Sequence, residues 1–433
     1  MVCFFEDGKQ ISRRYYKRNF EIDMKQGWEI KKLEELFDVQ SSKRVHKKDW
    51  QSEGVPFYRA REVVKLAKNG FVENELFISE ELFNEFTKDK GAPKEDDIII
   101  SAVGTLGQCY LVRKQDKFYI KDASVLWLSK KSEISSRYIE YSFKAPSIQE
   151  QVLDRSMGAT VGTLTISRAK NLEIPLPSLP EQQRIVSILD SAFAAIDKAK
   201  ANAEQNLQNA KELFESYLQG VFKKKVKGNK HDSLNDLCEL IVDCEHKTAP
   251  TQETGYPSIR TPNIGKGDLI LENVNRVSHD TYIKWTRRAI PKSGDLILAR
   301  EAPAGNIAVV PDNVEVCLGQ RTVLIRPKKD KLIPNYLAYL ILSKDVQKIL
   351  LDHSTGATVQ HINMKDIRAF KIYDLSDLDE QNFIVNQLDN LRVETLKLEA
   401  VYQKKMDDLE ELKKSILQKA FAGELETKKA LVV

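Results

Sequence analysis

The chain has 433 residues, of which 42% are hydrophobic and 30% charged. This is the composition of a globular protein with a heavily solvated surface and excludes a disordered one. The 67 lysines and arginines nearly balance 63 acidic residues, and a net charge of +4 is too small to indicate nucleic-acid binding by itself. At this length we expect two or more folded units.

Cysteine usage and hydropathy indicate the compartment. The five cysteines are an odd number and widely spread, which is typical of a reduced protein. Residues 1–23 lack the apolar core of a signal peptide. No apolar run approaches the roughly 20 residues that a membrane helix needs. We therefore expect a cytoplasmic protein without a membrane span.

The first globule is predicted over residues 28–179, after an N-terminal extension at residues 1–27. Short β-rich runs such as DDIIISAV and SVLWLS alternate there with turns that contain Gly, Pro and Asp. This pattern predicts an α+β fold, a mixed globule rich in short strands.

Basic residues cluster in this first globule. Arginine suits bidentate contact with guanine, lysine suits contact with phosphate, and nearby aromatic residues such as Trp50 and Tyr58 add apolar surface. Any single one of these cations is more commonly a solvated surface charge. As a group they are candidate DNA contacts: Lys43, Arg44, Lys47, Lys48, Arg59 and Arg61.

A long helix is predicted over residues 180–222. Ser178 and Glu181 have the spacing of a capping box, with Pro180 in the first turn. A heptad pattern of apolar residues then continues for some thirty residues, which favours packing of helix on helix. The helix-pairing candidates in this segment are Ile185, Leu189, Ile196 and Leu213.

The rest of the chain repeats the same plan after a basic linker, KKKVKGNK, at residues 223–230. The tetrapeptide GATV at Gly158 recurs at Gly356, an offset of 356 − 158 = 198, and Glu181 recurs as Glu380, an offset of 199. A nearly fixed offset over a long span indicates duplicated structure. We therefore expect a second globule at 231–378, a second long helix at 379–425 and a tail at 426–433.

The second copy has its own basic residues and its own heptad pattern. Arg260 matches Arg59 although the neighbouring residues have diverged. The candidate DNA contacts of this copy are Lys247, Arg260, Arg287, Arg288, Arg300 and Arg321. Its helix-pairing candidates are Ile384, Leu388, Leu391 and Leu412.

The two heptad patterns predict that the long helices pair with each other, as an antiparallel coiled coil if the repeats are related by a pseudo-twofold axis. The alternative is two separate amphipathic helices, each lying on its own globule.

Recognisable catalytic and metal-binding motifs are missing. IGKGD at Ile264 lacks the first glycine of a phosphate loop, and G-x-S-x-G and H-E-x-x-H do not occur. The chain contains no Pro-Pro pair, which the target-base motif of amino-methyltransferases requires. Cys238, Cys244 and His246 lack the spacing of zinc ligands. We expect neither an enzyme nor a metal site.

In their order along the chain, the repeated segments resemble the specificity subunit of type I restriction-modification systems. The resemblance covers about residues 28–425, and the segments recur in order in the second copy. They are WEIKKLEELF at Trp28, GVPFYRAREV at Gly54, PKEDDIIISAVGTLG at Pro93 and GATVGTLTISRAKNLEIPLPSLPEQQRIVSILD at Gly158.

The resemblance implies a noncatalytic subunit in which two target recognition domains each read one half of a bipartite, asymmetric site on double-stranded DNA. Paired helices would set the spacing between the half-sites. Two methyltransferase (M) subunits and restriction (R) subunits would be the protein partners. No cofactor is implied for this chain, and S-adenosylmethionine, ATP and Mg would belong to those partners.

Two alternatives stay open at this point. One is the recognition subunit of a system whose partner fuses a methyltransferase and a nuclease. The other is a coiled-coil scaffold that binds only protein, against which the basic loops of both globules count.

Overall fold

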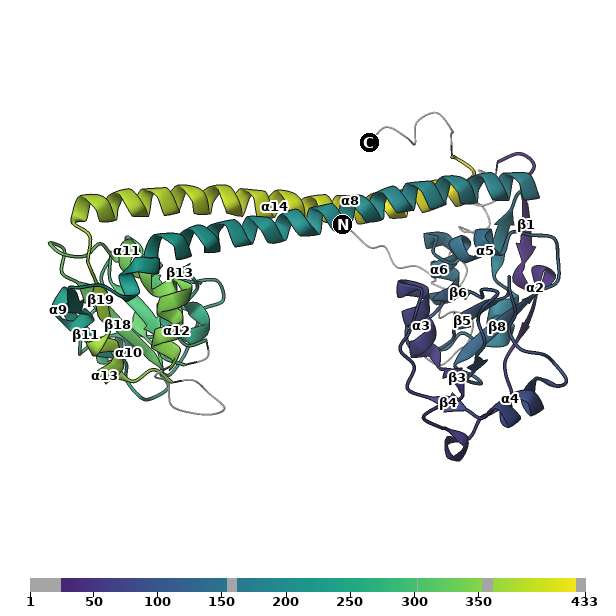
Figure 1. Cartoon of the computed structure of the whole chain (residues 1–433), viewed down its shortest axis with the longest axis horizontal. Coiled ribbons are helices and arrows are strands. Elements are labelled where there is room, and N and C mark those ends of the chain that lie inside the picture. Colours follow the sequence, from purple (N-terminus) through teal and green to yellow (C-terminus); the bar gives the residue numbers. More distant parts are fainter. Residues whose placement is uncertain (1–24, 154–161, 302, 353–360, 426–433) are drawn as a thin grey trace. The chain divides into compact units, whose positions relative to one another are not determined.

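The computed structural model describes residues 25–153, 162–301, 303–352 and 361–425. The chain divides into two compact units (Figure 1). Unit 1 comprises residues 1–202 and 405–433, and unit 2 comprises residues 203–404. Nearly all of the predicted N-terminal extension, the tail at 426–433 and both GATV segments lie outside the described residues.

Unit 1 contains three small sheets. The four-stranded sheet has the order β2-β8-β5-β6, formed by Phe37–Gln40, Val125–Lys130, Ile98–Ser101 and Cys109–Leu111. The three-stranded sheet has the order β4-β3-β7, formed by Phe77–Ile78, Val55–Tyr58 and Tyr119–Ile120. The antiparallel pair β1-β9 is formed by Glu29–Lys32 and Glu173–Leu176.

Short helices connect these strands. Most begin at a serine, a threonine or another residue in an extended conformation that caps the first turn. They are α2 (Leu33–Leu36), α3 (Ala60–Asn69), α4 (Glu80–Thr87), α5 (Ser136–Ser142), α6 (Pro146–Leu153) and α7 (Ile166–Lys170), with one 3₁₀ turn, η1 (Lys47–Asp49).

Unit 2 repeats this strand plan with one strand added. Its five-stranded sheet has the order β11-β18-β15-β16-β13, formed by Cys238–Asp243, Thr322–Pro327, Leu296–Ala299, Ile307–Val309 and Gly267–Asp268. The sheet β14-β12-β17 is formed by Arg276–Val277, Tyr256–Ile259 and Cys317–Leu318, and the pair β10-β19 by His231–Ser233 and Lys371–Tyr373. The prediction of two mixed globules rich in short strands is confirmed.

The helices of unit 2 occupy the same places between strands. They are α9 (Leu234–Leu237), α10 (His279–Trp285), α11 (Pro334–Leu342), α12 (Lys344–Asp352) and α13 (Met364–Ala369), with 3₁₀ turns η2 (Lys223–Val226) and η3 (Thr261–Asn263). The turn η2 lies within the predicted basic linker.

A buried aspartate accounts for one of the repeated segments. Asp97, in PKEDDIII, is fully buried and accepts hydrogen bonds from Trp127 Nε1 at 2.8 Å and from the Lys130 backbone N–H at 3.0 Å. Asp295, in PKSGDLIL, accepts from Arg326 at 2.7 Å. Each carboxylate joins the turn before a central strand to the neighbouring strand. A buried charge is costly without such partners, so the aspartate and its donors form one unit of structure.

Two long helices take part in both units: α8 (Leu179–Phe222, 44 residues) and α14 (Leu378–Ala422, 45 residues). In unit 1, Leu189 and Ile196 of α8 share one apolar cluster with Leu417 and Phe421 of α14. Ile185 and Leu409 belong to the same cluster.

Ion pairs join the same helix segments in unit 1. Lys200 Nζ lies 2.5 Å from Glu410, and Lys413 Nζ lies 3.1 Å from Asp197. Position 197 therefore faces 413 and position 200 faces 410, so the two segments run in opposite directions.

In unit 2 the other ends of these helices share a cluster. Leu218 and Phe222 of α8 are buried together with Val385 and Leu388 of α14 and with the core of the globule. Among the described residues, no helix combines the length and the apolar composition needed to cross a membrane.

Two predicted helix-pairing residues are not buried as expected. Leu213 is 51% exposed and Leu412 is 37% exposed, whereas Ala203 and Ala210, which follow Ile196 at seven-residue intervals, are buried. An α-helix has 3.6 residues per turn, so residues spaced by 3.5 drift around its surface by about 20° per heptad. Ile384 and Leu391 are partly buried.

The start of α8 also differs from the predicted capping box. Glu181 instead forms ion pairs with Arg184 at 2.6 Å and with Lys25 at 3.2 Å. Arg184 also donates to the Leu425 carbonyl at 3.3 Å. In α14 the expected cap is present, because Asp377 accepts the Glu380 backbone N–H at 2.8 Å.

The Glu181 ion pairs predict a pH-dependent contribution to stability. Hydrogen bonds from Arg184 and, to a smaller extent, Lys25 lower the pKa of Glu181 from 4.5 to about 2. A carboxyl group with a lowered folded pKa stabilises the fold above its unfolded pKa, and this contribution disappears as the pH falls from about 4.5 through 2. We expect Glu181→Gln to lower the free energy of unfolding by about 1 kcal/mol at pH 6, allowing for solvent screening.

Urea unfolding followed by circular dichroism at several pH values measures this effect. The difference between the variant and the wild type should shrink as the pH falls below about 4.5. Glu204→Gln, at an exposed position in α8, is the control and should behave as wild type. A difference for Glu181→Gln that stays constant down to pH 3 would contradict the assignment.

Candidate nucleic-acid interface

In each unit, an arginine follows the end of a strand that lies in a parallel pair. β3 pairs with β7 in unit 1, and β12 pairs with β17 in unit 2. Arg59 follows β3, and its backbone N–H donates to Glu62 at 3.0 Å. Arg260 follows β12, and its backbone N–H donates to Asn263 at 3.2 Å. The two arginines that the sequence alignment paired therefore occupy equivalent positions.

In unit 1, the loop after β2 lies against the end of β7. The Ser42 hydroxyl donates to the Ile120 carbonyl at 2.7 Å, and the Lys43 backbone N–H donates to the Tyr119 hydroxyl at 2.9 Å. Arg44 Nε donates to Asp122 at 2.9 Å. Because β7 pairs with β3, these contacts bring Lys43 and Arg44 to the same edge as Arg59.

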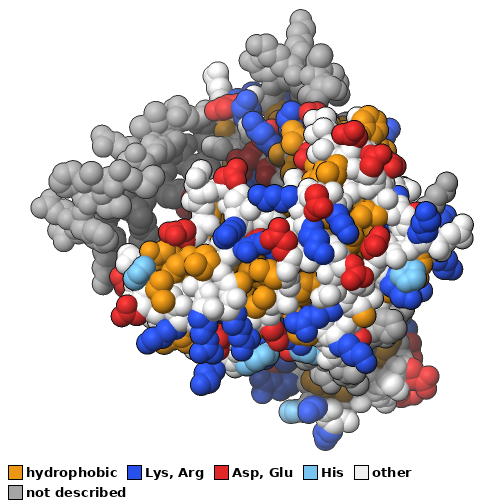
Figure 2. Space-filling view, turned by 90° about the vertical axis from the view of Figure 1, so that its left-hand side faces the viewer, with side chains coloured by type: hydrophobic (Ala, Val, Ile, Leu, Met, Phe, Trp, Pro, Cys, Tyr) orange, Lys and Arg blue, Asp and Glu red, His pale blue; other side chains and the backbone are white. Residues whose placement is uncertain are grey.

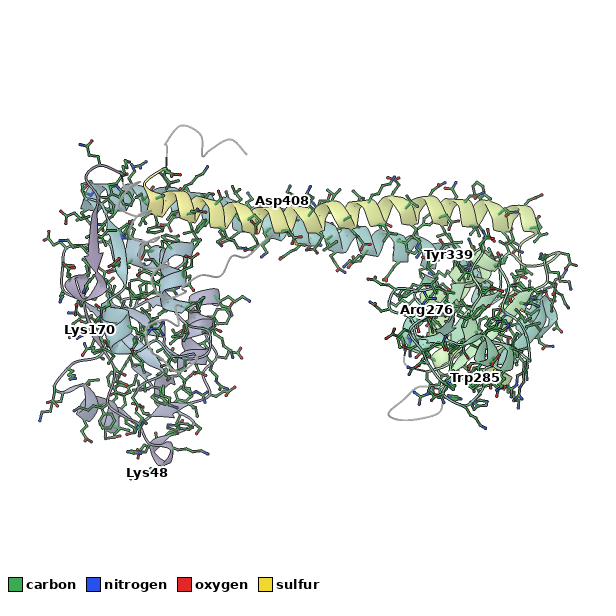
Figure 3. All side chains as sticks on the ribbon, turned by 180° about the vertical axis from the view of Figure 1, so that it is seen from behind. Lys48, Lys170, Arg276, Trp285, Tyr339 and Asp408 are labelled. Carbon is green, nitrogen blue, oxygen red and sulfur yellow. The ribbon has the colours of Figure 1, made fainter. Side chains whose placement is uncertain are left out.

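The remaining candidates of unit 1 surround this edge. Lys47 and Lys48 are exposed in η1, and Lys48 lies at the end of unit 1 opposite its long-helix segments (Figure 3). Arg61 is half exposed and forms ion pairs with Glu62 and Glu75.

Glu62 holds Arg59 and Arg61 in place. It is buried, and its carboxylate accepts from Arg59 Nη2 at 2.8 Å and from Arg61 Nε at 2.5 Å. Burial alone would raise the pKa of Glu62, but the hydrogen bonds from both arginines outweigh burial and lower it. The carboxylate therefore stays ionised at neutral pH and fixes both guanidinium groups.

In unit 2, Arg300 lies at the centre of a polar cluster. It is only 7% exposed, and its guanidinium donates to Asp243 at 2.8 Å and to the Ile362 carbonyl at 2.9 Å. A third nitrogen lies 2.7 Å from His361 Nε2. Arg300 thus connects the end of β11, the end of β15 and the segment that precedes α13. With its polar atoms engaged inside the protein, Arg300 is placed to position other groups.

Exposed cations surround this buried arginine. Arg321 Nε lies 2.8 Å from Glu301, which also lies 2.8 Å from His361 Nδ1. Arg287 and Arg288 lie 2.8 Å and 3.7 Å from Glu245, in the loop after β11. Lys247 is exposed in the same loop.

Arg260 lies beside the connection from β17 to β18. Gly319 in that connection packs against it, and a Cβ at Gly319 would come within 2.5 Å of Arg260 Cγ. The structure therefore brings all six candidates of unit 2 to the loops at one edge. Figure 2 shows Lys, Arg and His side chains gathered along one edge of this unit with acidic side chains among them, and Trp285 marks its end opposite the long helices in Figure 3.

The two edges have the same backbone plan but different side chains. The Ala102 carbonyl accepts the Leu164 N–H at 2.8 Å, just as the Arg300 carbonyl accepts the Ile362 N–H at 3.0 Å. Arg300 thus corresponds to Ala102, which has no polar side chain. Unit 2 has the buried guanidinium cluster where unit 1 has an alanine.

Sequence reasoning missed the residues that hold these cations. Glu62, Asp243, Glu301 and His361 do not form a motif, and most of their partners are distant in the chain. The only sequence signal is that Glu62 and Glu301 each lie next to a predicted arginine.

The sequence matches the model of the type I restriction modification DNA specificity domain twice, over residues 25–207 and 227–406. The chain belongs to this family. Each match contains one globule and about two thirds of the helix that follows it, so the duplication seen in the structure is a duplication of this domain.

Two curated relatives have similar sequences over different lengths of the chain. The type I restriction enzyme EcoBI specificity subunit of Escherichia coli is 24% identical over 305 residues, 65% of this chain and 64% of that protein. The putative type I restriction enzyme MjaX specificity subunit of Methanocaldococcus jannaschii is 22% identical over 440 residues, 96% of this chain and 98% of that protein.

Solved structures share the fold. A chain from work on complex assembly and conformational transition of the type I R-M system has a TM-score of 0.72 at 20% identity, covering 93% of this chain and 99% of that one. The HsdS subunit from Thermoanaerobacter tengcongensis has a TM-score of 0.59 at 18% identity, covering 93% and 98%.

The Arg300 cluster predicts a loss of stability confined to unit 2. Arg300→Met leaves the Asp243 carboxylate without its buried partner, and such a change costs about 3 kcal/mol. Arg287→Ala removes an exposed cation and should cost less than about 0.5 kcal/mol. Hydrogen exchange of the amides in β11, β15 and β18 measures the loss of stability in each of the two variants. Equal protection in the two variants would contradict the central role of Arg300.

Proposed function

We propose that this chain is the noncatalytic DNA sequence-recognition subunit of a type I restriction-modification enzyme. Each unit reads one half of a bipartite, asymmetric DNA site. The observation that carries this proposal is that one backbone plan, built twice, presents Arg59 and Arg260 at equivalent positions among different neighbours. Two equivalent edges with different side chains suit two different half-sites.

The proposed domains follow the repeat. Residues 28–179 and 231–378 are the target recognition domains, residues 223–230 link the copies, and residues 180–222 and 379–425 are spacer helices. We take the helices to form a continuous antiparallel coiled coil with pseudo-twofold symmetry. The opposed ion pairs of unit 1 and the mixed apolar clusters of both units support this arrangement.

The proposed chemistry of recognition uses the basic edges. Lysines of the loops, such as Lys43, Lys47, Lys48 and Lys247, neutralise phosphates, and arginines with free N–H groups contact base edges in the major groove. Arg59 and Arg61 are held by Glu62 and Arg321 by Glu301, which orients the guanidinium groups before DNA arrives.

The proposed partners supply the catalysis. Two M subunits dock on the helices, and R subunits join the complex for cleavage. S-adenosylmethionine, ATP and Mg belong to those subunits. The relatives from Escherichia coli and Methanocaldococcus jannaschii, both named as specificity subunits of type I restriction enzymes, support this assignment.

Co-expression with the neighbouring methyltransferase, followed by genome-wide mapping of methylated adenines, tests the proposal. We expect one split motif with two defined halves and a fixed gap. A continuous motif, or no methylation with a methyltransferase shown to be active with another specificity subunit, would overturn the proposal.

Substitution of each equivalent arginine should impair recognition of a different half-site. We expect Arg59→Ala to relax or abolish recognition of one half and Arg260→Ala of the other, each weakening binding by roughly 10- to 100-fold. Lys211→Ala, on the exposed surface of α8, is the matched control. Binding of DNA fragments mutated in one half at a time measures this. Equal weakening on every sequence would make the arginines phosphate contacts instead.

Shortening both α8 and α14 should shorten the gap between the two DNA half-sites. We take the register of the Asp197–Lys413 ion pair to continue along the proposed coiled coil, so that residues 204–210 of α8 pair with residues 400–406 of α14. Deleting both heptads removes about 10 Å of helix, which corresponds to about three base pairs at ~3.4 Å each. Methylation mapping of the deletion variant reads the gap directly. An unchanged gap with both halves still recognised would rule out the spacer role.

A further inference from the structure

A buried glutamine explains the repeated Glu-Gln of the sequence. Gln182 in α8 is 2% exposed and Gln381 in α14 is fully buried. Glutamine is rarely buried to this extent, and a buried amide must have its hydrogen-bonding groups satisfied.

In unit 1, the Gln182 amide joins the start of one helix to the start of another. Its Oε1 accepts the backbone N–H of Ser135, the residue that caps α5, at 2.9 Å. Its Nε2 donates to the carbonyl of Pro177, just before α8, at 2.8 Å. The start of the globule helix α5 is therefore bonded to the first turn of the long helix.

Unit 2 has the same joint. Gln381 Oε1 accepts the backbone N–H of Ile333, the residue that caps α11, at 2.9 Å. Its Nε2 donates to the carbonyls of Lys331 at 2.9 Å and Ser376 at 2.8 Å.

A second bond joins the same helices two turns further on. The Tyr141 hydroxyl of α5 donates to Asp190 of α8, and the Tyr339 hydroxyl of α11 donates to Asp389 of α14 at 2.5 Å. The intervals are equal, 190 − 182 = 8 and 389 − 381 = 8 residues, or about 12 Å of helix. Burial and the neighbouring carboxylate raise the pKa of both tyrosines, so each hydroxyl remains a donor at neutral pH.

The glutamine and tyrosine hydrogen bonds lie some distance apart along the long helix. Together they prevent the globule from rotating relative to that helix, which one bond alone would allow. A recognition domain extends about 30 Å from its helix, so a tilt of about 10° at the joint moves its far edge by about 5 Å. That movement exceeds the ~3.4 Å rise of one base pair. Helix length alone therefore cannot restrict the gap between half-sites to one value, and the angle at each joint must be fixed as well.

We propose that Gln182 and Tyr141 in unit 1, and Gln381 and Tyr339 in unit 2, are positioning residues. Together they fix the angle between each recognition domain and its spacer helix, and so restrict recognition to a single gap length between the half-sites. The inference rests on the proposed function. It adds to helix length a second determinant of site specificity, one that touches no base.

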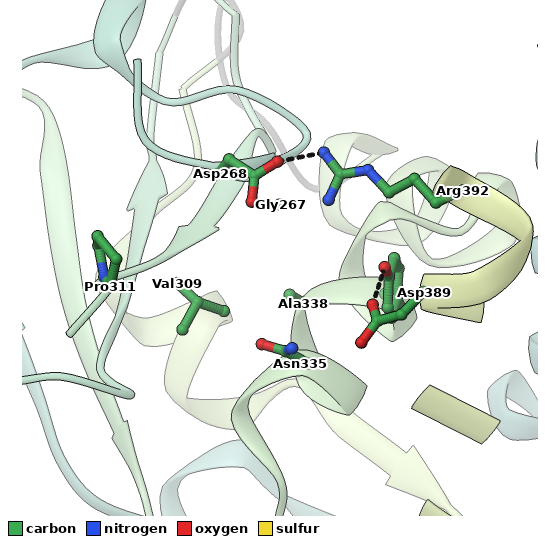
Figure 4. A pocket seen from close by; sticks show the side chains of 9 residues that line it. Gly267, Asp268, Val309, Pro311, Asn335, Ala338, Asp389 and Arg392 are labelled. Atoms are coloured by element: carbon green, nitrogen blue, oxygen red, sulfur yellow. Dashed lines mark hydrogen bonds and ion pairs between the residues drawn. The ribbon is translucent and has the colours of Figure 1, made fainter. Parts of the chain in front are cut away.

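The two joints are not equally packed. In unit 1, Arg137 also binds Asp190, at 2.9 Å, and so reinforces the second bond. In unit 2 the equivalent position is Asn335, and Arg392 of α14 interacts with Tyr339 instead. A pocket of about 240 Å³ lies where β13 and β16 face α11 and α14, lined by Asn335, Tyr339, Asp389 and Arg392 among others (Figure 4). The ion pair between Arg392 and Asp268 lies across this pocket. Loosening should therefore have the larger effect in unit 2.

The test uses the full chain with its methyltransferase partner and a DNA library that keeps both wild-type half-sites and varies the gap by single base pairs. Tyr339→Phe and Gln381→Met, alone and together, remove hydrogen bonds while keeping most of the side-chain volume. We expect methylation at gaps one base pair longer or shorter to rise about tenfold relative to the wild-type gap in the double variant, the scale of one lost hydrogen bond. The bases required in each half should not change.

Tyr110→Phe is the matched control. It removes a hydroxyl that donates to Asp116 at 2.8 Å within the globule of unit 1, away from the long helices. It should leave the gap preference unchanged. The milder Tyr339→Phe keeps the ring and its packing, and carries the test if the double variant does not fold.

The outcomes separate the two proposals. If the wild-type chain directs methylation to no split motif, the proposed function fails. The positioning role is tested if the wild type directs methylation to a single gap length. It is overturned if the folded Tyr339→Phe and double variants methylate only that same gap length, or lose activity equally at all gap lengths. If the same gap broadening appears in Tyr110→Phe, general loosening of the globules is responsible and the positioning role is likewise overturned.

Discussion

Each unit depends on one apolar cluster that joins part of the core of its globule to segments of both long helices. In unit 1 the cluster contains Tyr138 of the globule, Leu189 of α8 and Phe421 of α14. In unit 2 the cluster contains Tyr336 of the globule, Phe222 of α8 and Leu388 of α14. In proteins, most of the stability of a helix comes from packing of its apolar face against other elements. The globule and the helix that follows it are therefore one folding unit.

Polar groups at the edge of this core organise charge. The net charge of +4 is small because 67 lysines and arginines nearly balance 63 acidic residues. At the candidate edges, several cations also have an acidic partner, as Arg59 has Glu62 and Arg300 has Asp243. Such partners cost little affinity if the guanidinium already points where the ligand will bind, since its side-chain entropy is lost before binding. The proposed DNA contacts are thus a matter of arrangement more than of total charge.

Duplication explains how one chain can serve two half-sites. The parallel pairs β3–β7 and β12–β17 keep one register, so the backbone positions at the edge are the same in both units. Loops carry different side chains on that constant frame, with Ala102 in one unit and Arg300 in the other. Divergent loops on a repeated scaffold are the arrangement expected when binding residues change faster than the core that supports them.

The duplication, the mixed globules and the long helices can be predicted from the sequence, because each follows from a local pattern: a constant offset, short β-rich runs and heptad spacing. The sequence also placed Arg59 and Arg260 at equivalent positions. It missed Glu62, Asp243 and His361, and it placed Leu213 and Leu412 in the helix contact. These points depend on three-dimensional packing, because a carboxylate meets its arginine through strand pairing between distant segments, and the buried face of a long helix rotates away from an ideal heptad.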